Sequence, residues 1–367
     1  MAVGVDVAAT AGAVGVIVTW TSVMRVLVIP RGRSSALSRV VDRIVDATFQ
    51  LAARRVHDYQ RRDQLLAAQA PAYLLLLLAT WLAAFLVAFT LLLWPWHPAF
   101  GGAAREAASS MFTLGFDATA TPAPTILDVL AAATGLVVVA LQIAYLPTLY
   151  AAFNRRETEV TMLASRAGSP PWGPELLART RYGTRARTDD LPDYYALWER
   201  WAADVAESHT NYPVLTRFRS PQSHTSWLVG LLAVLDSAAL LLALCPSRDG
   251  IEPRLCLRMG FTALQQIGLV LGLRVEGDPD PDLPLLLPYA DYLAGVQRMT
   301  ATGFPIERSA EEAWPHFRGW RANYERVAYD IARLTDAVPA LWSGPRRWPA
   351  APVTTVRPPN RIARDAR

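Results

Sequence analysis

The chain has 367 residues, a formal charge of +4 and 52% hydrophobic residues, and its mean hydropathy is +0.18. So apolar a chain is not disordered over most of its length, and its size allows two soluble domains or a membrane part joined to one soluble domain. The positive hydropathy favours the second. All 36 basic residues are arginine, which we attribute to codon bias, so the basic pI of 9.2 indicates no nucleic-acid partner.

Residues 1–30 are expected to form an N-terminal transmembrane helix, because Val7 to Pro30 is uncharged as far as Arg25. The alternative is a signal peptide, but Asp6 replaces the usual basic start and no small-residue cleavage site follows.

Residues 31–70 are expected to hold an amphipathic helix over 35–66. Apolar residues recur there at helical spacing, namely Leu37, Val41, Ile44, Val45, Phe49 and Leu51. We favour a cytoplasmic helix that packs on a neighbour over an interfacial helix that lies on anionic lipid.

Two further spans are predicted within residues 71–154. Residues 64–104 hold no charged side chain, and Ala72 to Trp96 exceeds the roughly 20 apolar residues that a span requires. Leu127 to Phe153 is the other, and two arginines follow it directly.

The arginines predict the orientation of these spans through the positive-inside rule. Residues 25–63 carry nine Arg against four acids, and residues 155–188 carry seven against three. The connection at 97–128 carries one Arg against three acids. We therefore expect a multi-pass protein of the plasma (inner) membrane, with the N-terminus and the 97–128 connection outside and the C-terminal region cytoplasmic.

The connection between the last two spans has a distinctive order. A short amphipathic run, Ala103 to Met111, is followed by Phe-Thr-Leu-Gly-Phe-Asp at 112–117 and by a Thr- and Pro-rich return to Pro124. This order resembles the pore domain of the two-span potassium-channel family, which places a pore helix and a T-V-G-Y-G-D filter between its two spans. It is similar in particular to divergent ion-channel-family membrane proteins of actinobacterial type, through this loop, Ala140 to Tyr150 and Arg155 to Glu157.

The resemblance implies a re-entrant pore loop, a homotetramer and monovalent cations as the conducted species. Backbone carbonyls of a filter replace the hydration shell of the ion. The implied filter residues are Thr113, Leu114, Gly115, Phe116 and Asp117. Asp117 stands where the family has a second glycine, so potassium selectivity is in doubt, and a ring of Asp117 side chains could attract cations instead. The alternative interpretation is a structural external hairpin.

Three residues of the last span are candidates for gating or for lining the pore. Gly135 is either a hinge or a site of close helix packing, and packing is favoured. Gln142, a polar residue in a span, is expected to face protein or water. Pro147 is expected to kink the helix near its cytoplasmic end.

The C-terminal region is expected to be all α-helical. Residues 155–190 are interpreted as a linker, 191–343 as a cytoplasmic helical domain and 344–367 as a disordered basic tail. Helices are expected at 192–209, 222–244, 254–275, 285–300 and 310–341. The stretch from Trp227 to Ala243 is apolar enough for a fourth span, but Asp236 at its centre favours a core helix.

No constellation indicates an enzyme, a metal site or a cofactor. The polar residues Glu207, Ser208, His209, His224 and Asp236 lack ligand-type spacing, and the two cysteines suggest neither a disulfide framework nor a zinc site. Arg217 to Pro221 is read as a helix-entry turn rather than an anion site.

Two functions therefore remain. The first is a tetrameric cation channel with a cytoplasmic regulatory domain. The second is a non-conducting, membrane-anchored scaffold or sensor that acts through its helical domain.

Overall fold

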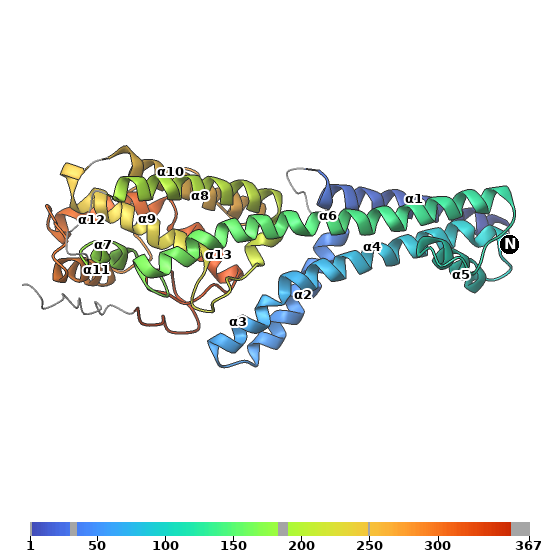
Figure 1. Ribbon diagram of the computed structural model, residues 1–367, viewed down its shortest axis with the longest axis horizontal. Helices are drawn as coiled ribbons and strands as arrows, with labels where there is room; N and C mark the ends of the chain where they lie inside the picture. Colours follow the sequence, from blue (N-terminus) through green and yellow to red (C-terminus); the bar gives the residue numbers. More distant parts are fainter. Residues whose placement is uncertain (1, 30–34, 183–189, 249, 354–367) are drawn as a thin grey trace, which may run out of the picture. The chain divides into compact units, whose positions relative to one another are not determined.

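The computed structural model describes residues 2–29, 35–182, 190–248 and 250–353. These residues form helices joined by turns and loops, and the described part contains no strand. The chain divides into two compact units, Met1–Ala151 and Ala152–Arg367. Helix α6 belongs to both units, because it runs unbroken from Pro122 to Ala167 (Figure 1). The predicted all-α class is confirmed.

The first unit is built around a long antiparallel pair, α1 and α4, with α5 packed on the far part of α4 (Figure 1). Its elements are α1 (Ala2–Leu27), α2 (Ala36–Arg54), α3 (Tyr59–Ala67), α4 (Gln69–Leu93), the 3-10 turn η1 (Trp94–Trp96), α5 (Phe100–Met111) and the first part of α6. The prediction of a single helix over residues 35–66 is wrong. It is two helices, because α2 ends at Arg54 and the side chain of Asp58 caps a new helix by accepting from the Arg61 amide at 2.9 Å.

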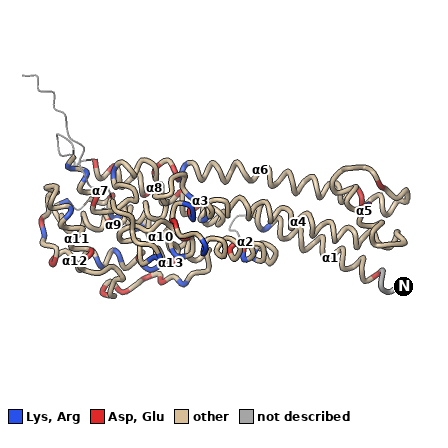
Figure 2. Tube along the Cα trace, turned by 90° about the horizontal axis from the view of Figure 1, so that it is seen from below, with Lys and Arg blue, Asp and Glu red and all other residues tan. Residues whose placement is uncertain are grey.

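Several helices are long and apolar enough to cross a membrane. Among the described residues these are Asp6–Leu27, Tyr59–Trp96, Pro122–Ala167 and Trp227–Leu244. The first three coincide with the predicted spans. Figure 2 shows α1, α4 and the first half of α6 almost free of charge. Large apolar side chains are exposed on all three, among them Val14, Ile17, Leu75, Val87, Leu136 and Ile143. Such surfaces are expected of a protein embedded in lipid.

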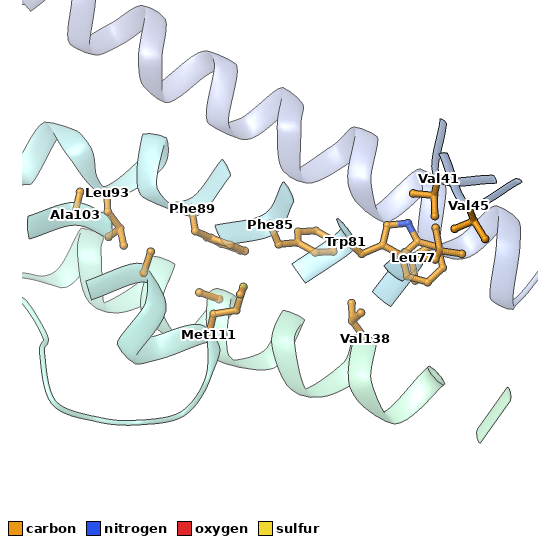
Figure 3. Packing of buried hydrophobic residues seen from close by; sticks show 13 residues of the cluster. Val41, Val45, Leu77, Trp81, Phe85, Phe89, Leu93, Ala103, Met111 and Val138 are labelled. Carbon is orange, nitrogen blue, oxygen red and sulfur yellow. The ribbon is translucent and has the colours of Figure 1, made fainter. Parts of the chain in front are cut away.

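Aromatic side chains of α4 form the core of the first unit (Figure 3). Trp81, Phe85 and Phe89 follow one another along the buried face of α4, and each is at most 2% exposed. The indole of Trp81 donates to Ser22 Oγ on α1 at 2.9 Å. The same cluster receives Val41 from α2, so α2 is a helix that packs on its neighbour.

The second unit is a bundle of helices around α9. Its elements after α6 are α7 (Gly173–Arg179), α8 (Leu191–Asn211), η2 (Pro213–Arg217), α9 (Trp227–Leu244), η3 (Pro246–Arg248), α10 (Ile251–Val270), α11 (Tyr289–Ala301), α12 (Ala310–Ala322) and α13 (Glu325–Leu334). Helix α7 lies within the segment interpreted as a linker. The helix predicted over 310–341 is two helices, which separate at Asn323 and Tyr324. The predicted tail is described only as far as residue 353.

Helix α9 is the core of this bundle, because every one of its 18 residues is buried. The buried Asp236 carboxylate at its centre pairs with Arg321 and accepts from Tyr324 Oη at 2.8 Å. Arg321 in turn donates to Glu325 at 3.0 Å and to Tyr329 Oη at 2.8 Å. Asp236 therefore has the partners that a buried charge requires. Within the second unit, protein rather than lipid can surround α9.

Candidate functional site

The loop after α5, residues 113–117, is the candidate site and is anchored by a short helix. Ala103, Ala107 and Met111 of α5 are at most 2% exposed and pack against α4, where Figure 3 shows Ala103 beside Leu93 and Met111 beside Phe89. Helix α5 therefore has a fixed apolar face, and the chain leaves its C-terminal end directly into the loop.

Left-handed backbone turns the chain at two places in this loop. Thr113 has a φ of 55° and Gly115 a φ of 70°. Glycine adopts this conformation without steric cost, whereas threonine does not. The surrounding contacts must therefore hold Thr113 in place.

Ser109, in the last turn of α5, binds four successive amide groups of the loop. Its carbonyl oxygen accepts from Leu114 N at 2.8 Å and from Gly115 N at 3.4 Å. Its hydroxyl oxygen accepts from Phe116 N and Asp117 N, both at 3.0 Å. The Ser109 side chain is itself only 1% exposed.

This arrangement fixes the direction of the loop carbonyls. The peptide bonds of residues 113–117 are trans, and in a planar trans peptide the N–H and the preceding C=O point in opposite directions. Because the amides of residues 114–117 face Ser109, the carbonyl oxygens of residues 113–116 point away from it. The side chains of Leu114 and Phe116 are 61% and 51% exposed.

Charged side chains hold the end of the loop. Arg105 Nε lies 3.1 Å from Asp117 Oδ2, and the Arg105 guanidinium lies 5.2 Å from the centre of the Phe116 ring. The fully buried Glu106 pairs with His97 and accepts from the amide of Thr119 at 2.5 Å. Consecutive residues of α5 therefore hold the loop and the segment that leads away from it.

Helix α6 lies against the C-terminal end of α5. A Cβ atom on Gly135 would stand 2.1 Å from the carbonyl oxygen of Met111, so the two backbones touch there. Ser110 Oγ donates to Asp128 Oδ1 of α6 at 2.6 Å. Gly135 thus lies next to the predicted site, where it allows α6 to pack closely against the end of α5.

The other two predicted residues of α6 lie apart from the loop. Gln142 and Pro147 follow Gly135 by seven and twelve positions, roughly 10 and 18 Å along a helix. Gln142 is 5% exposed and its Oε1 has no hydrogen-bond partner among the described residues. Pro147 is exposed, and α6 continues through it.

A second buried polar cluster surrounds Arg156 in the second unit. Its fully buried guanidinium donates to the carbonyl oxygens of Leu215 at 2.8 Å and Phe218 at 2.7 Å. It also lies 2.9 Å from His209 Nε2 and 2.7 Å from Glu157 Oε1. Burial, and then the Arg156 charge, hold the pKa of His209 well below its usual value, so the imidazole is neutral and Nε2 accepts from Arg156.

The polar residues weighed in the sequence do not form one site. His209 belongs to the Arg156 cluster, and Asp236 belongs to the Arg321 network in the core. No group of three His, Cys, Asp or Glu side chains in the described ranges is arranged to hold a metal ion. Cys245 and Cys256 are both buried free thiols.

Sequence reasoning missed Ser109, Arg156 and the role of Glu106. Only Ser109 carried a usable signal, since a serine four residues before Thr113 sits in the last turn of a helix, where its side chain reaches freed amides. The comparisons add no assignment: no family model, no curated protein and no solved structure matches the chain. The class is therefore defined by its own fold, an all-α protein with several apolar helices of membrane-spanning length.

Proposed function

We propose that the chain is one subunit of a homotetrameric cation channel, in which the re-entrant 113–117 loop between α4 and α6 lines the pore. Helices α1, α4 and α6 then cross the membrane, and α5 enters it from outside. The arginines that follow α1 and lie beyond the span in α6 support an outside N-terminus and a cytoplasmic second unit.

The direction of the loop carbonyls carries the proposal. A conduction path needs several backbone carbonyl oxygens on one side of a strand, where they replace the water around the ion. The four contacts to Ser109 turn the carbonyls of residues 113–116 away from Ser109 and leave them free to bind an ion, which supports the proposal. Non-helical backbone at membrane depth also requires a buried or water-filled setting, and a pore supplies it.

The exposed loop supports assembly of several copies. Leu114 and Phe116 are more than half exposed in a single chain, which is unfavourable for large apolar groups in water or beside an aqueous pore. One loop supplies the carbonyls of a single chain, so four loops around an axis are required to enclose an ion, as in the family that the sequence resembles.

The sequence suggested that a ring of Asp117 side chains attracts cations at the outer mouth of the pore, and the pairing of Asp117 weakens that attraction. A free ring of four aspartates would attract cations strongly. Each Asp117 is instead paired with Arg105, so the mouth carries no net charge from this pair. We therefore propose a pore of modest attraction for monovalent cations, potassium among them.

Flux measurements on purified protein in liposomes test the proposal. We expect potassium and sodium flux that Gly115→Pro abolishes, because proline fixes φ near −65° and removes the amide hydrogen, whereas Gly115 has φ +70°. No neighbour lies within 4 Å of a Cβ at Gly115 or at Gly101, so Gly101→Ala is the matched control and should conduct normally. Flux no greater than in empty liposomes, across varied pH and voltage, would count against a channel.

The alternative is a non-conducting scaffold or sensor anchored by its apolar helices. The observation that favours it is the compact second unit, with its own core helix and buried polar networks. Native mass spectrometry separates the two functions, because a channel requires a tetramer, and a monomer or dimer supports the scaffold.

A further inference from the structure

Helix α2 packs on α4 with one face only, and apolar side chains remain exposed on the other. Val41 and Val45 belong to the buried cluster around Trp81 (Figure 3). Val40 and Ile44, which precede them by one position each, are 45% and 53% exposed. Residues four apart lie one above the other on a helix, so Val40 and Ile44 form a continuous apolar strip on the exposed face.

The exposed charges of α2 are all positive. Arg39, Arg43 and Arg54 are exposed, whereas its two acids, Asp42 and Asp46, are partly buried. The Asp46 carboxylate accepts from one glutamine of α2 at 3.0 Å and from one of α4 at 2.8 Å. Within the described residues, no carboxylate forms an ion pair with Arg39 or Arg43. The exposed face of α2 therefore carries positive charge that the chain itself does not neutralise.

Arg39 and Arg43 lie next to each other on this face. They are four residues apart, and Nε of Arg43 donates to the carbonyl oxygen of Arg39 at 3.3 Å. The side chain of Arg43 therefore folds back along the helix toward Arg39. Cβ atoms at this spacing are roughly 6 Å apart, so a single phosphate group can contact both guanidinium groups. Val40 and Ile44 each follow one of these arginines directly, which places the apolar strip beside them.

Three helices meet at the start of α2. Ser22 Oγ of α1 lies 2.7 Å from Ser35 Oγ, the N-cap of α2, and accepts from the indole of Trp81 on α4 at 2.9 Å. From there α2 runs toward the first residues of α4, because Gln69 Nε2 donates to Asp46 Oδ1 at 2.8 Å. Helix α2 thus continues in the direction in which α1 ends.

This contact places the arginines near the end of the predicted spans. Helix α1 ends at Leu27, five residues or roughly 8 Å beyond Ser22. Arg39 and Arg43 follow Ser35 by four and eight residues, roughly 6 and 12 Å along α2. They therefore lie on either side of the level at which α1 ends. In a membrane that α1 and α4 cross, this is the level of the lipid headgroups.

We infer that Arg39, Val40, Arg43 and Ile44 form a binding site for an anionic phospholipid. The guanidinium groups bind the phosphate oxygens, and the apolar strip lies against the first carbons of the acyl chains. Charge complementarity selects this occupant, because the membrane surface that basic segments face is negative. The site requires that α1 and α4 cross a membrane, and it does not depend on whether the chain conducts ions.

Native mass spectrometry of the full chain, released from detergent micelles with added lipid, tests this site. Dioleoylphosphatidylglycerol is the anionic probe, and dioleoylphosphatidylcholine is the zwitterionic comparison with the same acyl chains. We expect the chain to retain the anionic lipid more tightly. Arg39→Gln and Arg43→Gln should each weaken its retention about fivefold, which is the contribution of one arginine near a charged membrane surface. Neither change should affect retention of the zwitterionic lipid as strongly.

Arg54→Gln is the matched control. It removes an exposed arginine of the same helix that lies eleven residues beyond Arg43, roughly 16 Å farther from the spans, and it should leave retention unchanged. Free glycerol phosphate carries the headgroup chemistry without acyl chains, so an equal concentration should not displace the lipid. The replaced arginines are exposed, so the variants should fold, and circular dichroism checks this. Equal retention of the two lipids, an equal loss in Arg54→Gln, or displacement by glycerol phosphate would overturn the inference.

Discussion

Arg105 on α5 forms a 3.1 Å ion pair with Asp117, the last residue of the 113–117 loop. The pair is partly exposed, with 65% of the Arg105 side chain and 35% of the Asp117 side chain accessible. Exposed pairs contribute little stability, typically 1 kcal/mol or less. The consequence of this contact is therefore electrostatic, since it cancels a negative charge at the proposed outer mouth.

Replacing Arg105 should increase cation flux. Arg105→Gln leaves Asp117 unpaired, and a ring of negative charge raises the local cation concentration. We expect a severalfold gain in single-channel conductance at low salt that shrinks as salt screens the ring. Arg105→Gln with Asp117→Asn restores neutrality and should return conductance to the original value. A gain that persists in the double variant would contradict this explanation.

Removing the Ser109 hydroxyl should disorder the loop. In Ser109→Ala the amides of Phe116 and Asp117 lose their acceptor, and the loss of each such hydrogen bond costs about 0.5–1.5 kcal/mol. We expect lost or unselective flux with α5 still in place. The neighbouring Ser110→Ala is the control, because its hydroxyl binds Asp128 and none of the loop amides. Equal flux in both variants would remove Ser109 from the proposed pore.

A methyl group at Gly135 should disrupt the contact between α5 and α6. The Gly135→Ala Cβ would meet the Met111 carbonyl oxygen at 2.1 Å, and backbone cannot yield as a flexible side chain does. Overpacking of this kind costs about 1–3 kcal/mol. Thermal unfolding should show the loss, and Gly101→Ala, whose Cβ meets no atom within 4 Å, should show none. Unchanged stability in Gly135→Ala would mean that the helices separate freely there, as a hinge requires.

Helices with strong hydrophobic patterns were predictable from the sequence, and their ends were less so. The stretch at 72–96 is apolar throughout, so length and composition alone predict a helix there. The break at Asp58 depends on one capping side chain, which periodicity over 35–66 cannot detect. The separation of α12 from α13 is equally hidden, although no side chain caps α13, because both helices continue one amphipathic pattern.

The contacts that position the candidate site depended on tertiary structure. Arg155 and Arg156 are adjacent and chemically identical, yet 56% of the Arg155 side chain is exposed and Arg156 is fully buried. No sequence rule distinguishes them, because burial follows from the rotation of α6 against α8 and η2. The contacts of Ser109 to the loop amides likewise depend on how the chain folds back after α5, so the sequence alone does not predict them.

This pair of arginines supplies a matched stability test. Arg156→Gln leaves two carbonyl oxygens, His209 and Glu157 without their buried partner, and breaking a buried charge pair costs about 3–5 kcal/mol. Arg155→Gln removes a 3.1 Å surface pair with Asp204 and should cost at most about 1 kcal/mol. Denaturant unfolding monitored by tryptophan fluorescence measures both. Similar losses in the two variants would contradict the burial of Arg156.

Acid should destabilise the second unit through His209. Its pKa is lowered in the folded state, first by burial and then by Arg156, from an ordinary value of 6.5. Below that value the unfolded chain binds a proton that the folded chain excludes, so stability falls as pH falls, by up to about 1.4 kcal/mol per pH unit. The contribution is fully present above pH 6.5 and is lost progressively below it.

The variant His209→Gln isolates this contribution, because glutamine keeps an acceptor for Arg156 and does not titrate. Unfolding measured between pH 7.5 and pH 5, a range on the order of one unit to either side of the ordinary histidine pKa, should show a shallower loss of stability than in the unaltered chain. His224→Gln, at an exposed histidine, should keep the original slope. If the three proteins lose stability in parallel, His209 takes up its proton in the folded state. Its Nε2 could not then accept from Arg156, and the buried cluster would need a different set of hydrogen bonds.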